Sequence, residues 1–301
     1  MKQTLFSILI ANYNNGRYLQ EAIDSVLAQT YTNWEVILVD DKSTDKSFEI
    51  YEKYKDDIRF HIYYNEVNKG CGYTKRRCAQ LANGELCGFL DPDDKLESNA
   101  LELMVLQHKA KPNCSLIYST LYLWEATTDS KTILEDVGAM ADDESFLTSS
   151  NKIVSHFAVF KKPFYDKTKG IDETLSSAVD FDLYVKLEEV GELLFVDIPL
   201  YYYRQGNVNS ISIGNSELEK KAFANRIKAS LNAFVRRIKG EHSLFVNNKQ
   251  NSLHVMRWQL GYYYKNNGRF SWRWLGYAYW YWRGNASSIK SLNHIRKAMV
   301  K

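Results

Sequence analysis

The chain has 301 residues and a mass of 35.0 kDa, enough for one large domain or for a domain with an appendage. Its residues are 45% hydrophobic and 25% charged, which excludes a mainly disordered chain. The net charge of +3 conceals a division. Residues 1–215 hold 22 Lys and Arg against 33 Asp and Glu, a net charge of −11, whereas residues 216–301 hold 17 against 3, a net charge of +14. This asymmetry indicates two regions with different surroundings.

Targeting signals are not evident. Residues 1–11 carry one lysine and a short apolar run before polar Asn12, which predicts a buried strand better than a signal peptide. No stretch reaches the roughly 18–20 apolar residues of a membrane span, and the longest candidate, Trp274–Trp282, is bracketed by Arg273 and Arg283. The four cysteines lack CxxC spacing, which predicts no zinc site, reduced thiols and a cytoplasmic protein.

The first 120 residues alternate short apolar runs with stretches of helical spacing. Strands are predicted at 6–11, 34–40, 59–64, 85–91 and 115–119, and helices at 18–29, 44–54, 72–82 and 97–110. Alternation of this kind is typical of βαβ units and of a mostly parallel α/β sheet flanked by helices. The runs VILV and GFL are apolar throughout, as strands covered on both faces require.

The later part of the chain is less regular. We predict further strands at 152–160 and 192–197 and helices at 180–189 and 220–239, whereas residues 120–155 show no clear pattern. Strand signals fade after about residue 216. The chain is therefore predicted to comprise an α/β domain over residues 1–215 and a basic, aromatic-rich helical region over residues 216–301.

Polar residues follow the predicted strands, where ligands bind in an α/β sheet. The sharpest cluster is Asp91, Asp93 and Asp94, whose carboxylates repel one another unless a cation compensates. Such hard oxygen ligands suit Mg²⁺ or Mn²⁺, and the alternative is an acidic turn that caps the next helix. Asp40 and Asp41 end the second strand, where they could recognise a base or ribose, or merely precede a helix cap.

The ordered series of motifs resembles glycosyltransferase family 2, with the nucleotide-sugar-binding GT-A fold, over roughly residues 4–215. The matching segments are Ala11–Asn14, Leu27–Asp41, Asn68–Gly70, Ala82–Glu85, Phe89–Asp94, Gly170–Glu173, Val179–Leu183 and Tyr203–Arg204 with Ser210 and Ser212. Each segment is common alone, but the series at these spacings is specific. The resemblance implies that residues 1–215 are the catalytic domain of a non-processive, inverting transferase that uses a nucleotide sugar, typically a UDP sugar, in bacterial cell-surface polysaccharide or glycolipid synthesis.

The resemblance also implies which residues hold the nucleotide. Ala11, Tyr13 and Asp40 are expected to form the pocket for the base, with Asp41 beside them. Lys75 offers positive charge for the phosphates, and Arg204 is expected to approach the diphosphate.

Two further roles follow from the same resemblance. Asp91 and Asp93 match the DxD motif, whose carboxylates hold the ribose and a divalent metal, here Mn²⁺ or Mg²⁺, that neutralises the leaving group. Asp180 matches the catalytic base that takes the proton of the acceptor hydroxyl. The alternative for Asp180 is a simple helix cap.

Several positions depart from the family pattern. Val179 replaces the usual acidic residue before the base, Pro92 stiffens the metal loop, and Lys75–Arg76 and Cys78 stand where an Arg-Asn pair and a glycine are common. These departures leave nucleotide binding in place and put the choice of donor in doubt. His156 is interpreted either as a structural histidine or, less favourably, as a group that faces the cleft.

The basic aromatic tail has two competing interpretations. Tryptophan, tyrosine and basic residues suit the interface of an anionic membrane, so the region could bring a glycan or lipid-linked acceptor to the enzyme at the inner membrane face. Alternatively, the aromatic residues pack between helices or at a homodimer interface. Nucleic acid is not an expected partner.

Two other functions compete with the transferase. A sugar nucleotidyltransferase would show a glycine-rich basic loop after the first strand, where this chain has Asn12–Gly16. A non-catalytic nucleotide-sugar-binding or scaffold protein is supported by Val179 and opposed by Asp180.

Overall fold

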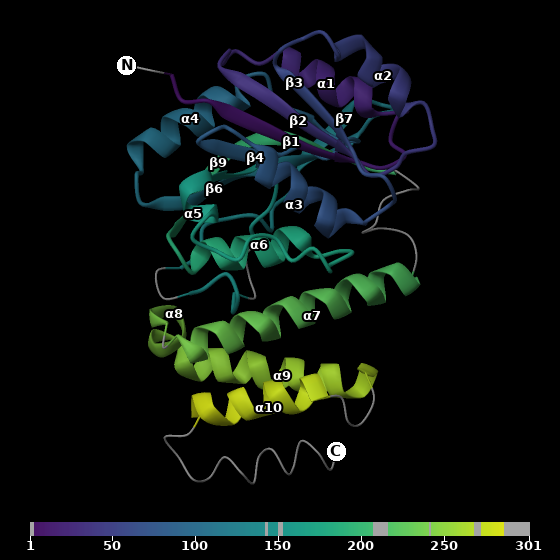
Figure 1. Cartoon of the computed structure of the whole chain (residues 1–301). Helices are drawn as coiled ribbons and strands as arrows, with labels where there is room; N and C mark the ends of the chain where they lie inside the picture. Colours follow the sequence, from purple (N-terminus) through teal and green to yellow (C-terminus); the bar gives the residue numbers. More distant parts are fainter. Residues whose placement is uncertain are drawn as a thin grey trace.

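The computed structural model describes residues 3–141, 144–149, 153–206, 216–240, 242–267 and 272–285. One sheet has helices on both faces, and a stack of further helices lies beneath it (Figure 1). Its strands are β1 (Phe6–Asn12), β2 (Trp34–Asp40), β3 (Phe60–Tyr64), β4 (Leu86–Phe89), β5 (Lys95–Leu96), β6 (Cys114–Glu125), β7 (Ser130–Ile133), β8 (Ala158–Lys161) and β9 (Glu192–Arg204). Its helices are α1 (Leu19–Leu27), α2 (Ser47–Tyr54), α3 (Cys71–Leu81), α4 (Ala100–Ala110), α5 (Lys162–Tyr165), α6 (Val179–Glu188), α7 (Ser216–Lys239), α8 (Ser243–Asn247), α9 (Lys249–Asn267) and α10 (Trp272–Asn285).

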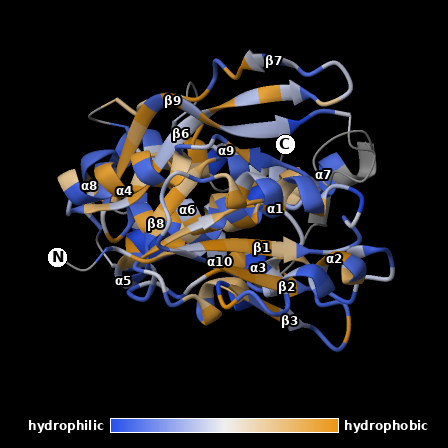
Figure 2. Ribbon diagram, turned by 90° about the horizontal axis from the view of Figure 1, so that it is seen from above, coloured by the Kyte–Doolittle hydropathy of each residue, from blue (hydrophilic) through white to orange (hydrophobic). Residues whose placement is uncertain are grey.

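The central strands are apolar because both faces of the sheet are covered. Successive side chains of a strand point to opposite faces. Ile8 and Val36 therefore belong to one buried cluster, which includes residues of α1, α2 and α4. Leu9 and Ile37 belong to a second cluster, which includes residues of α3 and α6. Figure 2 shows the hydrophobic residues concentrated along β1 and β2, as this double burial requires.

The strand directions are more mixed than the expected mostly parallel sheet. The order is β3-β2-β1-β4-β8-β6-β9-β5, with β7 paired to β6. Neighbours from β3 to β4 are parallel, as are β6 and β9, whereas β8 and β5 are antiparallel to their neighbours and β7 is antiparallel to β6. A parallel partner requires a crossover, usually through a helix, and the described residues between β7 and β8 form no helix. The predicted α/β fold with a helical carboxyl-terminal region is confirmed.

Most predicted elements lie within a few residues of the observed ones, and the exceptions have physical causes. The strand predicted at 152–160 narrows to β8, and the strand predicted at 192–197 extends to Arg204 because it pairs with β6 over most of its length. Two short strands, β5 and β7, were not predicted. β7 is exposed at every residue, so no apolar alternation marks it.

Helices α7, α9 and α10 lie one beneath another, with α7 next to α6 (Figure 1). Their buried residues join the lower core of the sheet, since Ile227 and Phe234 of α7 belong to the same cluster as Leu183 of α6. The proposed boundary at residue 215 falls within 207–215, outside the described residues. The shared cluster shows that the apolar core continues from the sheet into the helical region.

Most of the described tail aromatics pack internally. Trp274, Tyr277 and Tyr281 of α10 are buried, and Tyr263 of α9 packs edge-on against Tyr277. Tyr279 is exposed, while the side chain of Trp272 and residues 286–301 lie outside the described part. Packing between helices thus accounts for much of the aromatic content. None of the helices in the described residues is both long and apolar enough to cross a bilayer.

Candidate active site

A cavity of about 880 Å³ opens where β1, β2 and β4 end and where α3 and α6 begin. Its described lining comprises Ala11–Asn15, Asp41, Asn68, Gly70, Cys71, Thr74, Lys75, Asp91–Asp94, His156, Ser176–Asp180, Tyr203 and Ala222. Most of the expected site residues are therefore brought together: Ala11, Tyr13, Asp41, Lys75, Asp91, Asp93 and Asp180. Asp40 and Arg204 are not among the lining residues.

The end of β1 forms one wall of the cavity. Tyr13 is 48% exposed at this wall, whereas the neighbouring Asn12 is fully buried and donates hydrogen bonds to Tyr51 and Ser47. The hydrogen bonds of the buried amide nitrogen fix the strand end. Because the strand end is held in place, the ring of Tyr13 is available to stack on a planar ligand.

Asp40 and Asp41 have different surroundings. The Asp40 carboxylate accepts hydrogen bonds from the Tyr51 hydroxyl at 2.6 Å and from the Ser43 backbone N–H at 2.9 Å. It therefore supports the loop from behind and does not face the cavity. This position does not support its expected contact with the base. Asp41 lines the cavity instead, because successive side chains at a strand end point in opposite directions.

The Asp41 carboxylate lies in the cavity wall. It accepts hydrogen bonds from the backbone N–H groups of Lys69 and Gly70, both at 2.8 Å, and from the Asn65 side chain at 2.7 Å. Gly70 has a φ of 85°, a conformation that glycine adopts without steric cost, which explains the Asn68-Lys69-Gly70 segment. The loop before α3 thus holds this carboxylate in a fixed position.

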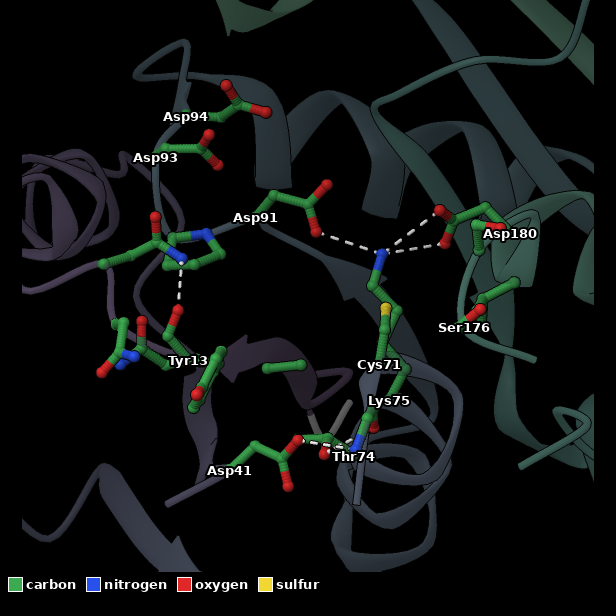
Figure 3. A pocket seen from close by; sticks show the side chains of 18 of the residues that line it. Tyr13, Asp41, Cys71, Thr74, Lys75, Asp91, Asp93, Asp94, Ser176 and Asp180 are labelled. Atoms are coloured by element: carbon green, nitrogen blue, oxygen red, sulfur yellow. Dashed lines mark hydrogen bonds and ion pairs between the residues drawn. The ribbon is translucent and has the colours of Figure 1, made fainter. Parts of the chain in front are cut away.

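Lys75 joins two carboxylates across the cavity (Figure 3). Its Nζ lies 3.0 Å and 3.2 Å from the two carboxylate oxygens of Asp180 and 3.1 Å from Oδ1 of Asp91. Lys75 is only 4% exposed, and burial alone would lower its pKa. The charges of Asp180 and Asp91 outweigh that effect, so the pKa of Lys75 is raised well above its ordinary value and the side chain stays protonated.

Asp91 is also close to His156. Burial alone would raise the pKa of Asp91, but the Lys75 ammonium and then His156 hold it below its ordinary value. His156 Nε2 lies 4.0 Å from Oδ2 of Asp91, and its ring stacks on Tyr201 with centroids 5.2 Å apart. His156 therefore lines the cavity, which supports the less favoured of its two interpretations.

The turn after Asp91 is anchored by β9. Asp94 accepts hydrogen bonds from the Tyr201 hydroxyl and from the Arg204 backbone N–H, both at 2.8 Å. Burial and then the charges of Asp93 and Asp91 raise the pKa of Asp94 well above its ordinary value. Asp94 is thus a structural member of the acidic cluster, and the side chains of Asp91 and Asp93 remain directed to the cavity.

Arg204 lies beneath this turn instead of approaching a diphosphate. Its guanidinium donates to the Asp93 carbonyl at 2.6 Å, forms an ion pair with Glu21 and packs between the rings of Tyr18 and Trp124. Two of the three guanidinium nitrogens and its planar surface are thus engaged. The expected contact of Arg204 with the diphosphate is therefore corrected: it positions the acidic turn.

Asp180 occupies the first turn of α6. The dipole of the helix favours a negative charge at this end. The preceding Ala178 has a φ of 56°, a strained conformation for a residue other than glycine. The segment is held from α7, because Asn225 donates to the hydroxyls of Ser176 at 3.1 Å and Ser177 at 2.8 Å. No motif signals this contact in the sequence, since α7 follows more than 30 residues later.

The acidic residues can contribute to a metal site but not complete one. Within the described ranges, no group of three or more His, Cys, Asp and Glu side chains could hold a metal ion. Mg²⁺ typically takes only one or two carboxylates together with substrate phosphates. Asp91 and Asp93 face the cavity and fit such a shared site.

The fold and this cavity define a class of protein: an α/β enzyme with paired carboxylates at the strand ends. Residues 7–168, more than half of the chain, match the family described as glycosyl transferase family 2. The chain belongs to that family, as the motifs predicted.

Known relatives agree with this assignment. The chain is 30% identical to chondroitin synthase of Escherichia coli over 75% of its own length and 32% of the synthase. It is 30% identical to hyaluronan synthase of Pasteurella multocida over 76% of its own length and 23% of that protein. Its fold resembles that of S. aureus TarS residues 1–349 in complex with UDP-GlcNAc, with a TM-score of 0.58, 17% identity, and coverage of 85% of this chain and 80% of the other. The chain thus spans a third or less of these two synthases.

Proposed function

We propose that the protein transfers one sugar from a UDP sugar to an acceptor hydroxyl, with inversion, in the synthesis of a bacterial surface polysaccharide or glycolipid. The observation that carries this proposal is the arrangement of Asp91, Lys75 and Asp180, in which one buried ammonium lies about 3 Å from both carboxylates. The two relatives above are named as polysaccharide synthases, and the TarS structure contains UDP-GlcNAc. These names support the class of substrate.

The nucleotide is assigned to the wall formed by β1, β2 and the loop before α3. Tyr13 offers a ring for stacking, and Ala11 leaves room beside it. The rigid Asp41 carboxylate can accept a hydrogen bond from an N–H of the base, for which uracil is suited. Asp40 supports this wall from behind, through Tyr51 and Ser43.

The diphosphate is assigned to the acidic turn. Asp91 and Asp93 would hold Mn²⁺ or Mg²⁺ together with the phosphate oxygens, and the ion would neutralise the charge of the leaving group as a Lewis acid. Lys75 adds positive charge on the same side of the cavity. Arg204 contributes indirectly, since it fixes the backbone of Asp93.

Asp180 is assigned as the base. It can accept the proton of the acceptor hydroxyl while that oxygen attacks the anomeric carbon and the bond from that carbon to the diphosphate breaks. The carboxylate lies in the first turn of α6, and Lys75 fixes its orientation. One carboxylate opposite the leaving group gives a single displacement with inversion.

The helical region is assigned a second role at the inner face of the membrane. On α10, exposed Leu275 and Tyr279 lie among the basic residues Arg273 and Arg283. Such a surface suits an anionic bilayer and would bring the cavity to a lipid-linked acceptor. Flotation with liposomes that contain acidic lipid tests this role, and a dimer seen by light scattering with no flotation would favour an interface between copies instead.

The central experiment uses a panel of nucleotide sugars with Mn²⁺ or Mg²⁺. We expect UDP to raise the melting temperature only when metal is present, and Asp93→Ala to abolish that increase. Slow hydrolysis of one UDP sugar would identify the donor. Stabilisation by UDP without metal, unchanged in Asp93→Ala, would contradict the metal assignment.

A further inference from the structure

Two exposed aromatic side chains and one half-buried ring form a patch on α7 and α9, called here the aromatic platform: Phe223, Trp258 and Tyr262. Phe223 meets Tyr262 edge-on with centroids 4.8 Å apart, and Trp258 is stacked beside Tyr262 at 6.2 Å. Trp258 is 57% exposed and Phe223 39%, whereas Trp274 of the same region is 5% exposed. An exposed aromatic cluster of this kind marks a binding surface more often than a lone surface residue does.

The platform adjoins, along α7, a residue that lines the cavity. Ala222, which precedes Phe223 in α7, lines the cavity together with Ser176 and Ser177. Asn225, in the same turn, donates to both serine hydroxyls. Figure 1 shows α7 directly beneath α6, the helix that begins beside Asp180. A ligand that reaches Asp180 from this side therefore has to pass the amino-terminal half of α7.

The surroundings of the platform are basic. Exposed Lys220 and Lys221 lie on the same stretch of α7, and exposed Arg257 adjoins Trp258, whereas Glu219 is the acidic residue of this stretch whose side chain is described. The described basic side chains thus outnumber the acidic ones around the rings. Positive charge of this kind attracts anionic ligands and favours their approach.

We propose that the aromatic platform binds the acceptor glycan and that this glycan carries carboxylate or phosphate groups. Sugars present apolar C–H faces that pack against aromatic rings, and their charged substituents would pair with the lysine and arginine side chains. The chain of the acceptor would lie on Trp258 and Phe223 while its terminal hydroxyl enters the cavity toward Asp180. This inference rests on the proposed glycosyltransferase function and names the substrate for its acceptor side.

The test measures binding of two fluorescent hexasaccharides by anisotropy, with the full chain throughout. One alternates a uronic acid with an N-acetylhexosamine, and the other is the same chain with its carboxylates reduced to alcohols. We expect Trp258→Ala to weaken binding of the anionic hexasaccharide by about tenfold, because loss of a central aromatic contact typically costs at least this much affinity. Phe48→Ala on α2 is the matched control, since Phe48 is also 57% exposed, and it should leave binding unchanged.

The outcomes distinguish failure of the platform proposal from failure of the proposed function. If the wild-type protein binds neither hexasaccharide, or if Trp258→Ala binds the anionic one as tightly as Phe48→Ala does, the platform proposal is wrong. Equal binding of the anionic and the reduced chain by the wild type would overturn its charge preference. Stabilisation by UDP, measured in the same variants, should not change in Trp258→Ala. Saccharide binding that depends on Trp258 without any stabilisation by UDP would leave the platform standing and contradict the proposed function.

Discussion

The sheet and the helical region beneath it differ in charge and composition, yet both contribute to one cavity. Residues 1–215 are acidic and supply the carboxylates, whereas residues 216–301 are basic and hold most of the tryptophan. Even so, Ala222 of α7 lines the cavity. The change in composition therefore does not mark where the lining of the cavity ends.

Helix α6 shows most directly how the two regions depend on each other. Asn225 of α7 holds the segment before its first turn. At its other end, Arg237 is buried and donates to Glu188 at 2.6 Å and Glu189 at 3.3 Å, and Arg236 pairs with Glu189 at 2.9 Å. The helix that carries Asp180 is thus fixed at both ends by the basic region. Four predictions test how strongly the two regions are coupled.

The largest effect is expected in the sheet region. Asp180→Asn should lower the transfer rate by about 10²–10⁴-fold, because an amide cannot take the proton of the acceptor. Stabilisation by UDP and metal should persist, since Asp180 lies on the side of the cavity away from the assigned base pocket. Asp172→Asn is the control variant. Asp182→Asn is unsuitable because Asp182 pairs with buried Lys186. Full transfer activity in Asp180→Asn would show that another group is the base.

The next effect concerns the joint between the regions. Arg237→Met should reduce the free energy of unfolding by about 3 kcal/mol, because it leaves the carboxylates of Glu188 and Glu189 without this partner in a largely buried place. Urea denaturation would measure the loss. Lys55→Met removes an exposed ion pair with Glu52 and should leave the free energy of unfolding almost unchanged. Two separate unfolding transitions in the wild type would contradict the view that the regions form one unit.

A pH effect should originate in the sheet region. His108 of α4 is buried with its Nε2 at 3.0 Å from the Val159 carbonyl, and burial lowers its pKa to about 4. The unfolded chain takes up a proton near pH 6.5, which the folded protein does not do until about pH 4. Stability should therefore fall by up to about 3 kcal/mol as the pH decreases between these values.

Urea denaturation at several pH values would measure this slope in His108→Gln. We expect the variant to lose most of the slope, whereas His254→Gln, on the exposed face of α9, should retain it. An unchanged slope in His108→Gln would assign the acid sensitivity to other groups.

The smallest effect tests the contact between α7 and the segment that precedes Asp180. Asn225→Ala should lower kcat by up to about tenfold with little change in stabilisation by UDP. The strained conformation of Ala178 costs roughly 1–2 kcal/mol, and the variant removes the hydrogen bonds that support it. Ala178→Gly removes that strain and should restore much of the rate in the double variant. A loss of rate that glycine does not restore would mean that Asn225 acts in another way.

Much of the site could be predicted from residue order. The apolar strands and the polar residues after them identified Tyr13, Asp41, Asp91 and Asp93, because the carboxyl ends of parallel strands meet at one edge of a sheet. Asp180, on a helix, was identified only through the family resemblance. The resemblance to glycosyltransferase family 2 added their expected roles. These are local patterns, each contained within a few residues.

Other features could not be predicted because they depend on contacts between distant segments. Asp40 and Asp41 are chemically alike neighbours. Only the direction of each side chain determines that Asp40 supports the loop and that Asp41 lines the cavity. Arg204 has the charge expected of a phosphate ligand, but its partners Glu21 and Asp93 lie far away along the chain. The same holds for β7, which forms because β6 is there to pair with it.

The sequence by itself determined the family, the α/β fold with its helical tail and the acidic character of the cleft, since these follow from periodicity, motif spacing and composition. Only the tertiary structure decided that Lys75 joins Asp91 to Asp180, that Arg204 holds the turn and that α7 contributes to the cavity wall. Each of these depends on side chains brought within about 3–4 Å by packing of elements far apart in the chain, which no local pattern encodes.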